Sequence, residues 1–224
     1  MIKRLFLVPF FFINLSLFAQ NTGAGVLAMQ NYQYGRNAEA RNGMTQDTIR
    51  YYNEAIRLAT DEITRGVANI DTYAALTQTY NRLGQIQPQR YSDVITYGTQ
   101  GLRLRNDWRI VEIMGEAYFY LNNYTASLNS LQRYVNALPQ GERASVAYFF
   151  IGEIYRLQEK FRKADIAYTT ALQLESSSPL WWYRLGSVRE ALNENQAAIE
   201  AYNEVIRRDP SFRDTRDRLA RLRS

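Results

Sequence analysis

The sequence predicts an all-α fold in which antiparallel helix hairpins stack into a solenoid of about four to five repeats with a C-terminal cap helix. The main observation is a self-similarity, because residues 145–178 align with residues 179–212 at an offset of 34 residues without a gap. Within each repeat, large apolar residues recur at steps of three and four, as on one face of an α-helix. Prolines are few and long stretches lack glycine, which favours helices over a turn-rich β fold. One hairpin cannot bury its apolar face alone, so the units are expected to stack.

The positions shared by the two regular units are expected to pack their helices together. Tyr148 aligns with Trp182, and Gly152 aligns with Gly186. Glycines and alanines at such positions allow two helix backbones to come close. The predicted packing residues are Tyr148, Gly152, Trp182, Leu185, Gly186, Ala198 and Tyr202.

The remaining units are less regular, and insertions set their boundaries. Three extra residues fall around 140–142, and four more fall between 84 and 90. Near the C-terminus, an apolar stripe is surrounded by Arg and Asp, as expected of a solvating cap helix. The predicted segments are a signal peptide (1–19), a flexible leader (20–26), a degenerate helical hairpin (27–66), a repeat with a loop insertion (70–107), three repeats (108–144, 145–178 and 179–212) and the cap helix (213–224).

The first residues predict export. Lys3 and Arg4 precede an apolar run over residues 5–18 that is too short to span a membrane, and Ala19 offers a cleavage site. An uncleaved anchor or a buried first helix is the alternative. We therefore expect a periplasmic protein of a bacterium, or alternatively a secreted one.

Composition excludes several kinds of active site. The chain has no cysteine and no histidine, so thiolate chemistry, the usual zinc ligands and Ser-His-Asp arrangements are absent. Glu112 and Glu116 could in principle share acid–base work or a hard cation. Acidic residues are common on repeat surfaces, however, and we expect no enzyme, no cofactor and no metal.

The C-terminal segment is rich in arginine, with seven Arg from residue 205 onward. Such a surface could contact nucleic acid, but the export signal argues against that partner. Anionic lipid, cell-wall polymer or an acidic protein remain possible contacts, and a charged cap helix is the simpler interpretation. Membrane association is expected only through partners, and the oligomeric state stays open.

The 34-residue pattern resembles the tetratricopeptide repeat family, whose spacing reads W-x2-L-G-x2-Y, then A-x3-F, then A and P. The residues that carry the resemblance in the last unit are Trp182, Leu185, Gly186, Ala198, Tyr202 and Pro210. The resemblance implies a scaffold that binds a protein or peptide partner.

The resemblance also implies a concave groove lined by the first helix of each unit. Some family members hold a C-terminal carboxylate there with Lys and Asn at the fifth and ninth positions, which here hold Ala/Gln, Glu/Glu, Phe/Glu and Tyr/Ser. That clamp is therefore absent. An acidic, aromatic groove suits a partner segment with a basic residue and an apolar anchor, and an ordinary solvated face is the alternative. The predicted groove residues are Glu112, Glu116, Phe119, Phe149, Glu153, Tyr183 and Ser187.

The groove predicts which of its side chains are neighbours, and the resemblance to the family implies a role. Phe149 and Tyr183 occupy equivalent places in successive repeats, so we expect them side by side, next to Glu112, Glu116 and Glu153. The expected role is the assembly or docking of a cell-envelope complex, at the outer membrane, a secretion apparatus, a pilus or a periplasmic flagellar structure. The alternatives are a binding component that presents a small ligand or wall fragment to a transporter, which a buried polar cavity would favour, and an enzyme.

Overall fold

The computed structural model describes residues 23–223, and over that range it contains eleven α-helices and no strand. It confirms the all-α solenoid of stacked hairpins. The predicted signal peptide and the first residues of the leader lie outside the described residues. Among residues 23–223, every helix is too short or too polar to span a lipid bilayer.

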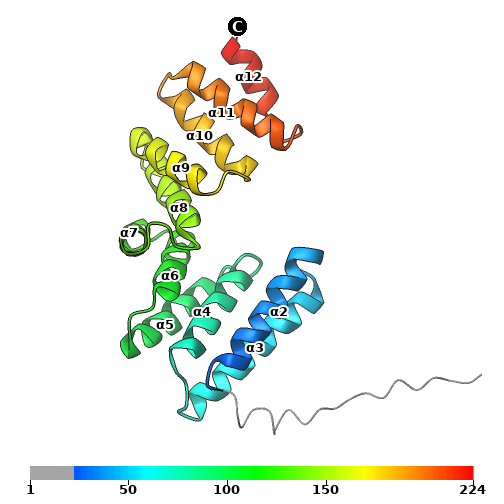
Figure 1. The fold of residues 1–224 in the computed structure, drawn as a ribbon, viewed down its shortest axis with the longest axis vertical. Coiled ribbons are helices and arrows are strands. Elements are labelled where there is room, and N and C mark those ends of the chain that lie inside the picture. Colours follow the sequence, from blue (N-terminus) through cyan, green and yellow to red (C-terminus); the bar gives the residue numbers. More distant parts are fainter. Residues whose placement is uncertain (1–22, 224) are drawn as a thin grey trace, which may run out of the picture.

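Ten of the helices form five consecutive hairpins, and the last helix covers the end of the array (Figure 1). The hairpins are α2 (Val26–Asn42) with α3 (Gln46–Thr64), α4 (Ile70–Gly84) with α5 (Arg90–Leu104), α6 (Trp108–Tyr120) with α7 (Tyr124–Ala137), α8 (Ala144–Leu157) with α9 (Phe161–Leu174), and α10 (Pro179–Ala191) with α11 (Asn195–Arg208); the cap helix is α12 (Thr215–Arg223). The inserted residues 140–142 lie in the loop between α7 and α8.

Local sequence sets the helix ends. Asn69 begins α4 with a capping box, because its side chain accepts hydrogen bonds from the backbone of Asp71 and Thr72 while the Thr72 hydroxyl accepts from the Asn69 N–H. At the other end of the first helices, Asn122 and Asn193 both adopt a positive φ near 60°. Asparagine tolerates this left-handed backbone conformation, which ends α6 and α10 and turns the chain back into the next helix.

Each hairpin closes around a glycine that allows a ring or a branched side chain to lie against the first helix. A Cβ at Gly152 would lie 2.6 Å from a ring carbon of Tyr168, and one at Gly186 would lie 2.6 Å from the Tyr202 ring. The remaining pairs are Gly35 with Tyr52, Gly84 with Tyr91, and Gly115 with Leu131. No larger residue fits at these close approaches without displacing its partner.

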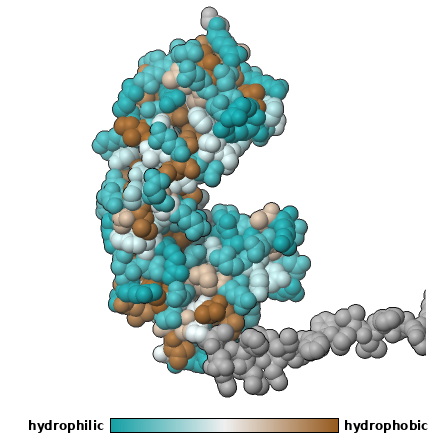
Figure 2. All heavy atoms as spheres, in the orientation of Figure 1, coloured by the Kyte–Doolittle hydropathy of each residue, from teal (hydrophilic) through white to brown (hydrophobic). Residues whose placement is uncertain are grey.

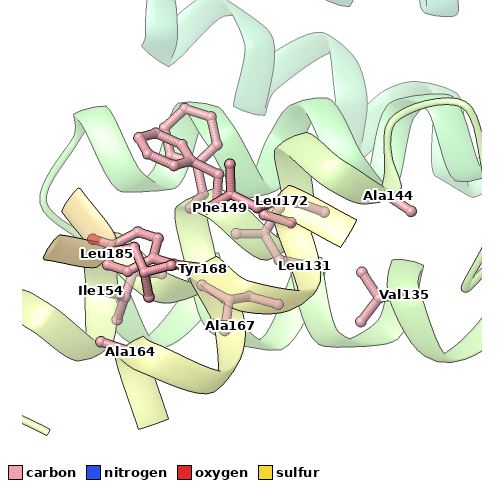
Figure 3. Packing of buried hydrophobic residues seen from close by; sticks show 14 of the residues in the cluster. Leu131, Val135, Ala144, Phe149, Ile154, Ala164, Ala167, Tyr168, Leu172 and Leu185 are labelled. Atoms are coloured by element: carbon pink, nitrogen blue, oxygen red, sulfur yellow. The ribbon is translucent and has the colours of Figure 1, made fainter. Parts of the chain in front are cut away.

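The core runs along the solenoid in clusters between neighbouring hairpins. Figure 3 shows part of the cluster from α6 to α11, where Leu131, Ile154, Tyr168 and Leu185 are almost completely buried. Burying a side chain of this size stabilises a fold by roughly 1.5–3 kcal/mol. These clusters join neighbouring units, as the stacking of a repeat array requires.

The stacked hairpins curve. In Figure 2 one side of the molecule is hollowed between the N-terminal and the C-terminal hairpins. In Figure 1 the same hollow is bordered below by α2 and α4 and above by α10, which are all first helices of their hairpins. The first helices therefore line the concave side.

Candidate functional site

The predicted groove carboxylates lie inside the protein and do not form an open acidic surface. The exposed fraction is 0% for Glu112 and 6% for both Glu116 and Glu153. Phe149 and Tyr183 are also buried, whereas Phe119 and Ser187 are half-buried. The binding role of these seven residues stays a prediction, but neither an acidic groove nor an ordinary solvated face describes their surroundings.

Arg143 brings Glu112 and Glu116 together. It stands at the start of α8, after the inserted loop, and its Nε lies 2.6 Å from Oε2 of Glu112 while its Nη2 contacts Oε1 of Glu116. The Asn81 amide donates a further hydrogen bond to Glu116, at 2.9 Å. One guanidinium from the following unit thus serves two carboxylates of α6.

The two carboxyl groups respond in opposite ways to this environment. Complete burial, followed by repulsion from Glu116, raises the pKa of Glu112 well above its ordinary value. Burial alone would also raise the pKa of Glu116, but attraction to Arg143 and hydrogen bonds from Glu112, Asn81 and Arg143 bring it below the ordinary value. The pair therefore holds its proton on Glu112 and its charge on Glu116.

Glu153 is also fully engaged within the protein. Arg184 on α10 places its Nε 2.9 Å from Oε1 of Glu153, which is an ion-pair distance without the alignment of a hydrogen bond. Arg156 donates two hydrogen bonds to Glu153, and the Tyr168 hydroxyl donates one. Burial and the neighbouring Glu153 charge raise the pKa of Tyr168, so its hydroxyl stays a donor.

This arrangement recurs at every junction between successive first helices, the cap helix included. A carboxylate on one first helix pairs with an arginine on, or immediately before, the next one. We call these contacts the inter-unit ion pairs: Glu39 with Arg82, Asp71 with Arg109, Glu112 and Glu116 with Arg143, Glu153 with Arg184, and Glu190 with Arg218. Only three of the 27 basic residues are lysines, and a planar guanidinium suits such shared pairing.

Sequence reasoning missed these arginines. A signal was present, because an Arg follows each paired acid by 27 to 43 residues, close to one repeat length. Periodicity of apolar residues does not contain this information, since the ion pairs lie beside the apolar stripe.

The aromatic neighbourhood also differs from the expectation. Phe149 stacks on Trp181, with centroids 5.1 Å apart and planes inclined by 14°. Tyr183 instead contacts Tyr202 and Phe212, and its hydroxyl donates to Asp214. Within the described residues no ring contact joins Phe149 to Tyr183, so the side-by-side prediction is wrong. Trp181 occupies the place on Phe149 that Tyr183 was expected to take.

The predicted packing residues fall into two groups. Gly152, Leu185, Gly186, Ala198 and Tyr202 are buried at helix contacts. The other two, Tyr148 and Trp182, are only half-buried. The indole N–H of Trp182 donates to the carbonyl of Ser176, and the guanidinium of Arg208 lies 5.0 Å from its ring centroid.

A pocket of about 420 Å³ lies between the first helices α2, α4 and α6 and the loop before α8. We call it the concave pocket. The residues of its lining that matter here are Tyr32, Arg36, Gln78, Arg109, Glu142 and Arg143. Arg109 and Arg143 belong to inter-unit ion pairs, whereas the side chain of Arg36 makes no ion pair or hydrogen bond with another described residue. The described part of the chain contains no group of three acidic residues placed to hold a metal ion.

Comparisons with known proteins agree with this architecture. The family model described as "Tetratricopeptide repeat" matches residues 145–178 and 182–212. The peroxisomal targeting signal receptor of Kluyveromyces lactis is 29% identical over 103 residues, which span 45% of this chain and 18% of that protein.

Solved structures share the fold over most of the chain. A crystal structure of MamA has a TM-score of 0.62 at 18% identity, covering 79% of this chain and 94% of MamA. MamA from residue 41 onward of Desulfovibrio magneticus RS-1 also has a TM-score of 0.62, at 19% identity, covering 85% and 99%. YrrB, described as a TPR protein with an unusual peptide-binding site, has a TM-score of 0.54 at 14% identity, covering 88% and 93%.

Proposed function

Because this chain belongs to the tetratricopeptide repeat family, we propose that it is an exported scaffold that holds a protein or peptide segment on its concave side during the assembly or docking of a cell-envelope complex. The observation that supports the concave side is the concave pocket, which is bordered by three first helices and one inserted loop. Chemically varied side chains from different units converge there, as a recognition site for an extended segment requires.

The envelope location is proposed on the residues before the described range. Lys3, Arg4, the apolar run of residues 5–18 and Ala19 have the composition of a cleavable export signal. A solenoid is suited to docking work because the curvature of its stacked units creates an extended concave binding surface. The proposed role needs no catalysis by the chain.

The buried carboxylates change the chemistry that we propose for the partner. A basic segment would have to compete with Arg143, Arg156 and Arg184 for Glu112, Glu116 and Glu153. Breaking such buried pairs leaves a charge without compensation, which costs about 3–5 kcal/mol. We therefore no longer favour a partner that inserts Lys or Arg between the first helices.

The experiment has two parts. The mass of the native protein, purified from the cells that make it, should correspond to a chain beginning near Gln20. Crosslinking of intact cells, followed by purification of this protein and mass spectrometry, should then recover an envelope protein. A chain retaining Met1 in the cytosol, with only cytosolic partners, would rule out the envelope role.

One observation favours a second candidate, a binding component that presents a small ligand to a transporter. The concave pocket contains three guanidinium groups and the amide of Gln78, and a polar lining is one part of the buried polar cavity expected of that class. Thermal unfolding in the presence of a periplasmic small-molecule extract separates the two. A stabilised transition with extract freed of protein and peptides would support the ligand-presenting role over the scaffold.

A further inference from the structure

We propose that the concave pocket receives an acidic side chain, of aspartate or glutamate, from an extended segment of the partner, and that Arg36 is its main ligand. This inference rests on the proposed scaffold function and specifies the chemistry of its partner. It reverses the charge that the sequence pattern of the groove suggested.

The first argument is that the pocket presents mainly hydrogen-bond donors. Arg36 lines it from α2, Gln78 from α4 and Arg143 from the start of α8. A guanidinium has five N–H donors and no acceptor, and it binds a carboxylate in a bidentate geometry. A ligand rich in acceptors therefore fits the lining better than one rich in donors.

The second argument separates Arg36 from the other two arginines. Arg109 is balanced by Asp71 and Asp107, and Arg143 is balanced by the charge of Glu116 and also donates a hydrogen bond to Glu112. These carboxylates occupy both guanidinium groups, so neither arginine is left with a full charge for a partner.

Arg36 has no ion-pair partner of its own among the described residues, in contrast to Arg82 and Arg184. Its charge acts on Glu39 only at longer range. Glu39, one turn further along α2, is already bound by Arg82. The guanidinium of Arg36 is therefore the charge on the pocket wall that remains for an incoming carboxylate.

The third argument concerns what would lie next to that carboxylate. Met29 and Ile113 contribute apolar surface to the same pocket, and Tyr32 contributes a ring. An acidic residue beside an apolar one would satisfy both parts of the lining. Glu142, on the inserted loop, is the one carboxylate in the lining, and it disfavours a second acid at that end of the pocket.

The probe is a display library of random twelve-residue peptides, selected on the full-length protein. The selected peptides should be enriched in Asp or Glu next to an apolar residue. In fluorescence anisotropy with the consensus peptide, Arg36→Gln should weaken binding by about tenfold or more, and neutralising the peptide acid should do the same. The two changes combined should weaken binding little further, because they remove the same contact.

Three variants make the result specific. Arg36→Lys keeps the positive charge and should retain part of the affinity. Arg50→Gln is the control, because Arg50 is an exposed arginine of α3 that pairs with Asp47, and it should leave binding unchanged. Gln78→Trp fills the concave pocket and should abolish binding. Since Arg36 makes no ion pair, its variants should unfold at the temperature of the wild type.

The outcomes separate this inference from the proposed function. Suppose that the selected peptides lose binding on Gln78→Trp but carry no acidic residue, or bind Arg36→Gln as tightly as the wild type. Either result would overturn the acidic-partner inference and leave the scaffold role standing. If the peptides bind Gln78→Trp as well as the wild type, or if the selection recovers no peptide, the result would count against the acidic-partner inference and against the proposed scaffold function.

Discussion

Arg184 on α10 places its Nε 2.9 Å from Oε1 of Glu153 on α8, so the carboxylate that the groove pattern assigned to a partner is held by the next unit of the same chain. Equivalent pairs recur at the other junctions between first helices. The acidic residues of the concave side thus serve to join the units.

The first prediction concerns Arg143, the arginine shared by two buried carboxylates. Arg143→Met should lower the free energy of unfolding by about 3–5 kcal/mol, because it leaves a buried negative charge without its partner. Arg65→Met is the control at an exposed pair, with Asp61, and should cost about 1 kcal/mol or less. Urea unfolding followed by circular dichroism measures both, and equal losses would contradict the structural role of the buried pairs.

The second prediction follows from the opposite pKa shifts of Glu112 and Glu116. The raised pKa of Glu112 means that folding takes up a proton above the ordinary value of 4.5, so stability should fall as pH rises toward and through the native value. Glu112→Gln mimics the protonated form and should remove this decline. The lowered pKa of Glu116 means that its contribution is present above 4.5 and is lost as pH falls through the native value.

Glu116→Gln should therefore destabilise the protein near neutral pH, with the difference from wild type shrinking in acid. Thermal unfolding of the two variants and wild type between pH 3 and pH 9 gives the comparison. If Glu112→Gln were the more damaging change at pH 7, the assignment of the proton to Glu112 would be reversed.

The third prediction tests the close approach inside a hairpin. In Gly152→Ala the new methyl group would meet the Tyr168 ring at 2.6 Å, and the ring is completely buried. We expect a loss of about 1–3 kcal/mol, as for other overpacked cores. In Gly98→Ala the nearest atom is the Met114 sulfur, at the flexible end of a side chain, so the roughly 1 kcal/mol gain in helix propensity should largely offset the contact.

The fourth prediction concerns Trp182, one of the packing residues predicted from the sequence. Its ring is half-buried, so Trp182→Ala should cost less than the roughly 3–5 kcal/mol typical of a buried aromatic residue. The side chain of Tyr202 is completely buried, and the stability loss from Tyr202→Ala should fall within that range. The same urea experiment compares the two, and a larger loss for Trp182→Ala would show that the indole contributes more to packing than its exposure implies.

The sequence allowed the solenoid to be predicted because stacking follows from apolar periodicity and from the spacing of Gly152, Gly186 and Tyr202. These residues report contacts inside one hairpin, where the spacing along the chain determines the geometry. The hairpin at 26–64 was harder to interpret, although Gly35 and Tyr52 make the same contact there.

The chemistry of the concave side could not be predicted in the same way. Whether Glu153 is open to solvent depends on Arg184, which lies one unit further along and contributes nothing to the apolar pattern. Similarly, Trp181 and Trp182 are adjacent in sequence, and it is Trp181 that stacks on Phe149. Charge pairing across units therefore required the three-dimensional structure.

The most direct test of the account is site-specific photocrosslinking in intact cells, with a photoreactive residue placed at Gln33, Ile166 or Arg216 in turn. Gln33 is an exposed residue of α2 that lines the concave pocket, the strongly exposed Ile166 lies on the second helix α9, and Arg216 lies on the cap helix α12. The account predicts a crosslinked partner from Gln33 and none from the other two positions. A partner captured from Arg216 or Ile166 but not from Gln33 would contradict it, because the working surface would then lie outside the concave pocket.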